Sequence, residues 1–192
     1  GKKIATGGPN SGAALTFELF TKHLGLWGKF TPIYLGGGKA VDAVGDRQVA
    51  AFNWTVNIGH STITQAAATY EIRLIDLGTP AEKSGLYKAY PYFSPCTIPA
   101  GAYKWIDEPV PSFQQSTTWT ANKDVDAEVV YQMIKQMYAA ENKEFLTNSI
   151  GKVFLEMTKE NALAGITIPL HPGAERFWKE QGVAIPPEIS AK

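Results

Sequence analysis

The chain has a single cysteine and no excess of charge of either sign among its 192 residues. One cysteine, Cys96, excludes an intrachain disulfide and a zinc ribbon. Basic and acidic residues both number 18, so no strong field draws the chain to nucleic acid or to an anionic membrane. No apolar run reaches the length of a membrane span. These shortages exclude a disulfide-stapled scaffold, a nucleic-acid binder and a membrane-spanning protein.

Sequence motifs for catalysis and metal binding are also lacking. His23, His60 and His171 are scattered and do not have the H-E-x-x-H spacing of a zinc site. No serine lies in a G-x-S-x-G elbow, and Cys96 falls in an apolar stretch where a thiol is expected to be inert. We therefore expect no metal and no cofactor, and a binding protein is favoured over an enzyme.

Enough apolar residues are present for a packed core, since 44% of the chain is hydrophobic and 19% is charged. The first half alternates predicted strands with predicted helices. Strands are expected at 3–6, 31–35, 48–53 and 72–77, and helices at 13–23, from Gly38 onward, and at 61–69. Repeated βα units of this kind predict a mainly parallel α/β sheet flanked by helices.

After residue 79 the alternation stops. We expect a helix at 80–90, a strand at 93–98, a loop at 100–110, a strand at 112–121, and helices through the last third. Asp124 is the predicted cap of the first late helix, and Pro172 the predicted start of the last one. The predicted apolar faces include Leu15, Val129, Phe145 and Ile150, and the tail after Gly182 is expected to be mobile or to lie on the surface.

The stretch Ile4-Ala5-Thr6-Gly7-Gly8-Pro9-Asn10-Ser11-Gly12 is the most informative part of the sequence. It is typical of a strand, a tight turn and the start of a helix. Unpaired backbone N–H groups and the positive end of the helix dipole then form an anion site. Gly8, Asn10, Ser11 and Gly12 are the candidate contacts for an acid group. An ordinary strand–helix turn explains the pattern about as well.

Two phosphate-binding interpretations fail on inspection of this turn. The spacing Gly7-x-x-x-x-Gly12 matches the start of a Walker A motif, but Ala13 and Ala14 stand where lysine and serine or threonine are required. A Rossmann fingerprint also needs G-x-G-x-x-G after the strand, and this is not present. The remaining interpretation is an uncharged cradle suited to a carboxylate.

Two further segments follow predicted strands, where α/β sheets bind ligands. The glycines at 36–38 permit close approach of a ligand, although a flexible turn is the simpler reading. Asn53 is a candidate to hydrogen-bond a ligand and Trp54 to wall the pocket. A core tryptophan beside a satisfied asparagine is an equally good alternative.

Several short segments resemble one known family. They are YPY at 90–92, TIPAGAY at 97–103, ENALAG at 160–165, PLHPGA at 169–174 and GKAVDA at 38–43. These segments are similar to the TAXI family of solute receptors that serve tripartite ATP-independent periplasmic (TRAP) transporters. The resemblance covers nearly the whole chain, and the segments after residue 90 are its most specific part.

The resemblance implies a type II periplasmic-binding-protein fold of the Venus-flytrap kind, located in the periplasm or otherwise outside the cytoplasm. Such a receptor captures a small organic anion, either a glutamate-like amino acid or a dicarboxylate, and delivers it to TRAP membrane subunits. Residues 1–110 are then the α/β ligand-binding lobe, and residues 111–192 a hinge-crossing strand with the C-terminal helical extension.

Members of that family are longer than 192 residues, so we expect this chain to be the second lobe with the N-terminal lobe missing. Such a fragment is expected to bind ligand weakly or not at all. It is also expected to leave apolar surface uncovered at Tyr131, Met137, Phe177 and Trp178, or to cover it by self-association.

Two alternatives to a receptor stay open at this point. One is the ligand-sensing effector domain of a regulator with the same fold. The other is an enzyme of porphobilinogen-deaminase-like fold, which needs a cysteine that carries a cofactor, and Cys96 lies in a poor context for that role.

Overall fold

The computed structural model describes residues 1–192, apart from the side chain of Lys152. Its internal contacts divide the chain into two compact units. Unit 1 contains Gly1–Tyr90 and Ser94–Gln114, and unit 2 contains Pro91–Phe93 and Gln115–Lys192. Each unit is described by itself below.

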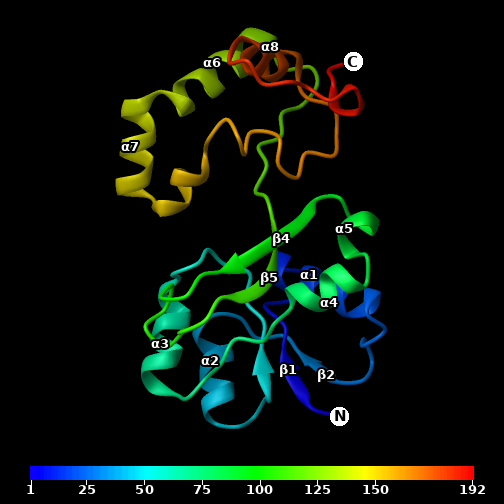
Figure 1. Cartoon of the computed structure of the whole chain (residues 1–192), viewed down its shortest axis with the longest axis vertical. Helices are drawn as coiled ribbons and strands as arrows, with labels where there is room; N and C mark the ends of the chain where they lie inside the picture. The colour runs from blue at the N-terminus through cyan, green and yellow to red at the C-terminus, as the bar shows by residue number, and fades with distance from the viewer. The chain divides into compact units, whose positions relative to one another are not determined.

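Unit 1 is built on a parallel three-stranded sheet (Figure 1). The strands are β1 (Lys3–Ala5), β2 (Thr31–Ile33) and β3 (Ala51–Phe52), in the spatial order β2-β1-β3. The central strand pairs with both neighbours, so Ala5 lies opposite Ile33 on one side and Phe52 on the other. All three strands therefore end at the same edge of the sheet.

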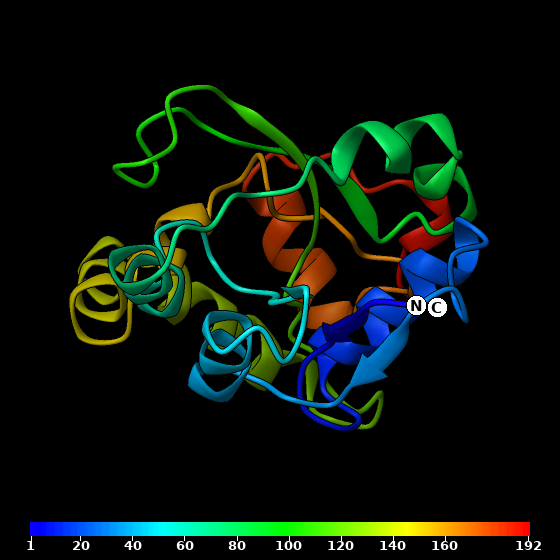
Figure 2. The same cartoon turned by 90° about the horizontal axis from the view of Figure 1, so that it is seen from below.

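Helices α1 (Gly12–His23) and α2 (Gly38–Gly45) lie on opposite sides of these strands (Figure 2). Ala5 is fully buried and packs with Ala40, Ala43 and Val49 on the α2 side. The small side chains at these positions allow α2 to approach the sheet closely. The predicted fold class, a mainly parallel α/β sheet flanked by helices, is confirmed.

Unit 1 also contains three shorter helices and most of a second sheet. The helices are α3 (Ser61–Thr69), α4 (Gly78–Lys83) and α5 (Leu86–Ala89), and the sheet pairs β4 (Phe93–Ile98) with β5 (Val110–Gln115). The bounds of α3 and β4 are those predicted from the sequence. The boundary between the two units crosses both strands of this second sheet. Phe93 of β4 and Gln115 of β5 belong to unit 2, and the other residues of the two strands belong to unit 1.

Three predictions for unit 1 are wrong. Residues 72–77 form no strand, because they do not pair with a neighbouring strand. Among the described residues, their one backbone hydrogen bond to a distant segment runs from the Leu77 N–H to the Pro111 carbonyl. Leu15 is 57% exposed, since the buried face of α1 is made by Ala13, Ala14, Phe20 and Thr21. The single helix expected at 80–90 is broken at Gly85, which adopts φ +73°.

Unit 2 is mostly helical. It contains α6 (Ala127–Tyr138), α7 (Ala140–Ser149), the 3-10 turn η1 (Lys152–Glu156), α8 (Pro172–Glu180) and the 3-10 turn η2 (Pro187–Ile189). Its core lies between α6 and α8, where Phe177 and Trp178 are each 5% exposed and meet the ring of Tyr138. The expectation that Phe177 and Trp178 leave apolar surface uncovered is therefore wrong.

Two predictions for α6 are also wrong: its cap lies two residues after the predicted Asp124, and its buried valine is one residue after the predicted Val129. Asp126 caps the helix by accepting from the Glu128 N–H at 2.7 Å, whereas Asp124 pairs with the exposed Lys123 ammonium. Val130 is buried while Val129 is exposed, so the helix faces α8 with the next residue along.

Other residues that the sequence placed in strands or apolar faces are exposed. Phe145 and Ile150 lie on the surface, and β5 ends at Gln115, before the threonine-rich segment around Trp119. The threonines of that segment favour a strand, but a strand needs a partner. Pairing with β4 stops at Gln115, so the segment stays irregular.

The C-terminal tail is fastened to α8. The N–H of Leu170 donates to the Ile189 carbonyl at 2.8 Å, and the Ile189 side chain is buried. The Glu175 carboxylate accepts from the Ser190 hydroxyl and the Ala191 N–H, and it pairs with Lys179. The tail after Gly182 thus packs on its own unit.

Replacing Glu175 by glutamine is expected to lower the melting temperature in a pH-dependent way. The Lys179 ammonium and the Ala191 N–H donate to this carboxylate and lower its pKa from 4.5 to about 2. A carboxyl whose pKa is lowered by folding stabilises the folded state at any pH above its pKa in the unfolded chain. This contribution is lost as the pH falls toward its pKa in the folded state. The difference between wild type and variant should therefore be full above pH 4.5 and shrink toward pH 2. Thermal melts across that range measure it.

The matched control is Glu144→Gln, which changes an exposed glutamate on α7. It should melt like wild type throughout. A Glu175→Gln difference that stayed constant down to pH 2 would contradict the assigned role of the carboxylate.

Candidate functional site

The carboxyl ends of the three parallel strands bring together the three segments that the sequence singled out. The turn from Gly7 to Gly12 follows β1, the glycines at 36–38 follow β2, and Asn53 with Trp54 follows β3. The chain leaves β1 for β2 on one side and returns to β3 on the other, so the strand order reverses at β1. Ligands of open α/β sheets bind at such a switch point, outside the carboxyl ends of the strands.

The turn after β1 is held in one shape by its own residues. Gly7 has φ +101°, and a Cβ there would lie 2.9 Å from the Ser11 Oγ, so glycine is required. Asn10 has φ +58°, a left-handed conformation that asparagine tolerates. The Ala14 N–H donates to the Ser11 Oγ at 3.2 Å. Ser11 is thus engaged in capping α1.

Backbone donors are left open at this helix start. Within the described residues, the N–H groups of Gly8, Asn10 and Gly12 make no hydrogen bond, while the Ser11 N–H donates to the Gly8 carbonyl at 3.1 Å. No heavy atom would lie within 4 Å of a Cβ on Gly8 or Gly12, so open space adjoins both positions. An anion can approach these donors, and the helix dipole favours it there.

Asn53 braces the turn from the neighbouring strand. Its N–H donates to the Ala5 carbonyl at 2.7 Å, and its side-chain amide donates to the Ala13 carbonyl at 3.0 Å. One residue thereby connects β3, β1 and the first turn of α1. Its amide nitrogen is already bonded to the protein. This agrees with the alternative of an asparagine whose hydrogen bonds are satisfied within the fold, and equally with a residue that holds the turn in position.

Trp54 lies against the glycine turn after β2. A Cβ on Gly36 would be 2.9 Å from the indole Cζ3 and 3.2 Å from the Gly8 nitrogen. Glycine at 36 is therefore what allows the indole and the first turn to meet. The Trp54 indole nitrogen is enclosed and has no hydrogen-bond partner.

Thr6 was missed by the sequence analysis as a site residue. It follows the last residue of β1, is 1% exposed, and its hydroxyl has no hydrogen-bond partner. The sequence signal was a hydroxyl at the end of the predicted strand 3–6, directly before the two glycines.

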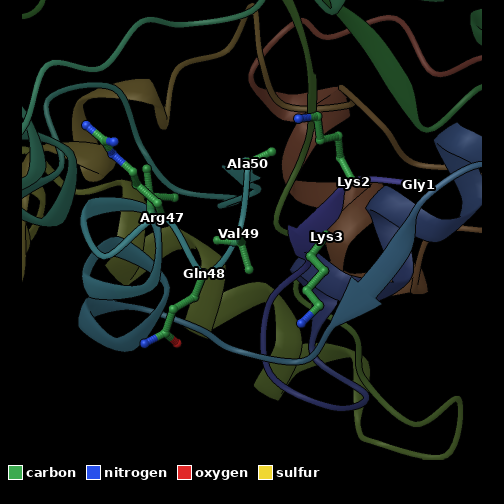
Figure 3. Close-up of a pocket in the computed structure, with 8 residues that line it drawn as sticks. Gly1, Lys2, Lys3, Arg47, Gln48, Val49 and Ala50 are labelled. Atoms are coloured by element: carbon green, nitrogen blue, oxygen red, sulfur yellow. The ribbon is translucent and has the colours of Figure 1, made fainter.

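A hollow of about 430 Å³ lies at the opposite edge of the sheet, at the amino ends of β1 and β3 (Figure 3). It is lined by Gly1, Lys2, Lys3, Val44, Arg47, Gln48, Val49 and Ala50. Lys2 and Lys3 extend their ammonium groups away from each other in Figure 3, as neighbours on a strand do. The hollow does not focus its cations on one point, so we do not place the ligand there.

The three histidines are used in the structure. His60 and His171 cap α3 and α8 by accepting from the Thr62 and Gly173 N–H groups. The His23 ring lies 3.0 Å from the Ser84 carbonyl. Within the described residues, no three histidine, cysteine or acidic side chains gather in a group able to hold a metal ion.

The fold and the turn after β1 together indicate the general class of the protein. A parallel α/β unit with open backbone donors at its switch point is a ligand-binding domain without an evident catalytic group. Comparison with family models then identifies the family: the NMT1-like family model matches residues 1–182, and the chain belongs to the NMT1-like family.

This family is periplasmic-binding-protein-like, and its general role is the binding of small solutes. Its members are generally not enzymes and are typically extracytoplasmic. None of the described helices combines the length and the apolar character that a membrane crossing requires. The predicted resemblance to periplasmic binding proteins is confirmed at this level.

Proposed function

We propose that this chain is the ligand-binding part of a TAXI-type receptor that serves a TRAP transporter. It captures a small organic anion in the periplasm, a glutamate-like amino acid or a dicarboxylate, and delivers it to the TRAP membrane subunits. The observation that carries the proposal is the set of unpaired N–H groups of Gly8, Asn10 and Gly12 beside open space at the switch point.

The chemistry of the turn favours a carboxylate. Three backbone donors and a helix start supply partial positive charge but no full cation, which suits one negative charge better than a phosphate. In this proposal Gly8, Asn10 and Gly12 contact the acid group, Ser11 and Asn53 hold the turn, and Trp54 forms the wall. Residues 1–110 carry this site, and residues 111–192 connect it to the rest of the receptor.

The expected affinity of this chain is low. A helix start contributes up to about 2 kcal/mol to anion binding, whereas millimolar affinity needs about 4 kcal/mol. The hydrogen bonds of the turn supply the difference. We therefore expect dissociation constants in the millimolar range, which amide chemical shifts detect well.

Titration of the ¹⁵N-labelled chain with L-glutamate or succinate is expected to shift the amide resonances of Gly8, Asn10 and Gly12 in a saturable way. The dication putrescine has a similar length and is expected to shift none of them. The Gly12→Val variant should weaken binding about tenfold, or about 1.4 kcal/mol, because its side chain covers the donors.

Ala140→Val is the control, because it places the same valine side chain at an exposed first residue of a helix, that of α7. It should bind like wild type. The proposal fails if neither acid moves the three amides at concentrations well above the millimolar range, or if putrescine moves them equally.

A further inference from the structure

Thr6 is the buried polar side chain nearest in sequence to the open donors of the turn. The residue is 1% exposed, and its hydroxyl has no hydrogen-bond partner in the structure. Its backbone N–H donates to the Ile33 carbonyl at 3.0 Å. The N–H is therefore used in the fold, while the enclosed hydroxyl is not.

The position of Thr6 is set by the sheet. Ala5 points into the cluster under α2, and successive strand residues point to opposite faces, so Thr6 faces the other side, where α1 lies. Thr6 directly follows β1 at the switch point, and Gly7 and Gly8 come next in the chain. Thr6 is therefore the last residue before the turn that presents the open N–H groups.

A buried hydroxyl without a partner weakens a fold, because its hydrogen bonds to water are lost and nothing replaces them. Valine has nearly the same shape and carries no such cost. Features that weaken a fold in this way are expected at functional sites. The indole nitrogen of Trp54, at the end of neighbouring β3, is a second enclosed donor without a partner.

We propose that the Thr6 hydroxyl is a ligand-binding group, which donates a hydrogen bond to the carboxylate held by the turn. The bond is made directly or through one water that enters with the ligand. This inference rests on the proposed function and adds to it a side-chain donor beneath the backbone donors. The hydroxyl of Thr6 then serves ligand binding and lowers the stability of the fold without ligand.

The Thr6→Val variant tests the idea because the two roles predict different results. If the hydroxyl binds ligand, the variant should melt at a higher temperature than wild type, yet bind L-glutamate and succinate about tenfold more weakly in the amide titration. Thr6→Ser keeps the hydroxyl and should bind within about twofold of wild type. Thr6→Ala provides a second variant without the hydroxyl, should the valine not be accommodated.

The outcomes separate this inference from the proposed function. Wild-type binding together with unchanged affinity in Thr6→Val or Thr6→Ala would overturn the role of Thr6 and leave the site at the turn intact. No binding of either acid by wild type would overturn both. Equal loss of affinity in Thr6→Ser and Thr6→Val would also overturn it, because that result would show a requirement for shape and not for the hydroxyl.

Discussion

Replacing Trp178 by alanine is expected to lower the free energy of unfolding by about 3–5 kcal/mol, the usual cost of removing a large buried aromatic side chain. Trp178 is 5% exposed, and its ring meets those of Tyr138 and Phe177 with centroids 4.8 and 4.9 Å away. Alanine leaves a cavity between α6 and α8 where the indole packed. Urea unfolding followed by circular dichroism measures the loss.

The control for this experiment is Trp119→Ala, because Trp119 is 65% exposed. It removes the same side chain from the surface of the same unit and should change stability by about 0.5 kcal/mol or less. If both variants lost the same stability, the assignment of the unit 2 core to the α6–α8 contact would be wrong.

The Gly78→Ala substitution is expected to cost about 2–3 kcal/mol. A Cβ at this position would lie 2.6 Å from the Ser112 nitrogen and 2.8 Å from the Pro111 carbonyl carbon. Both are backbone atoms of β5, so no side-chain rotation relieves the clash. The start of α4 must then move away from β5, which also strains the bond from the Leu77 N–H to the Pro111 carbonyl. The melting temperature of the variant reports the effect.

Gly38→Ala is a matched control for this variant. Gly38 is the first residue of α2 as Gly78 is of α4, and a Cβ on Gly38 meets no atom within 4 Å. Alanine there should be neutral or should stabilise the chain by about 0.4–1 kcal/mol through the unfolded state. Equal melting temperatures for the two variants would show that α4 does not pack on β5 as described.

The parallel sheet and its turns could be predicted from the sequence because local features determine them. Strand, glycine turn and amphipathic helix follow one another in the first 70 residues, and α3 begins and ends where the pattern does. The convergence of Gly8, Gly36 and Trp54 follows from parallel pairing alone, because parallel strands end at one edge.

The remaining features depend on contacts that a sequence pattern does not specify. Residues 72–77 have strand-like composition but no partner strand, so the chain there is irregular. The face of α6 is chosen by where α8 packs, which selects Val130 over Val129. The unpaired hydroxyl of Thr6 is visible only once the neighbours of that residue are known.

The double engagement of Asn53 has a consequence for the energetics of recognition. One residue ties the turn to two strands and to the first turn of α1 before any ligand arrives. In the proposed site, a ligand therefore meets a preorganised surface and spends little of its binding free energy on loop ordering. On that proposal the turn contacts only the carboxylate, so discrimination among acids of different length is expected to come from groups beyond the turn.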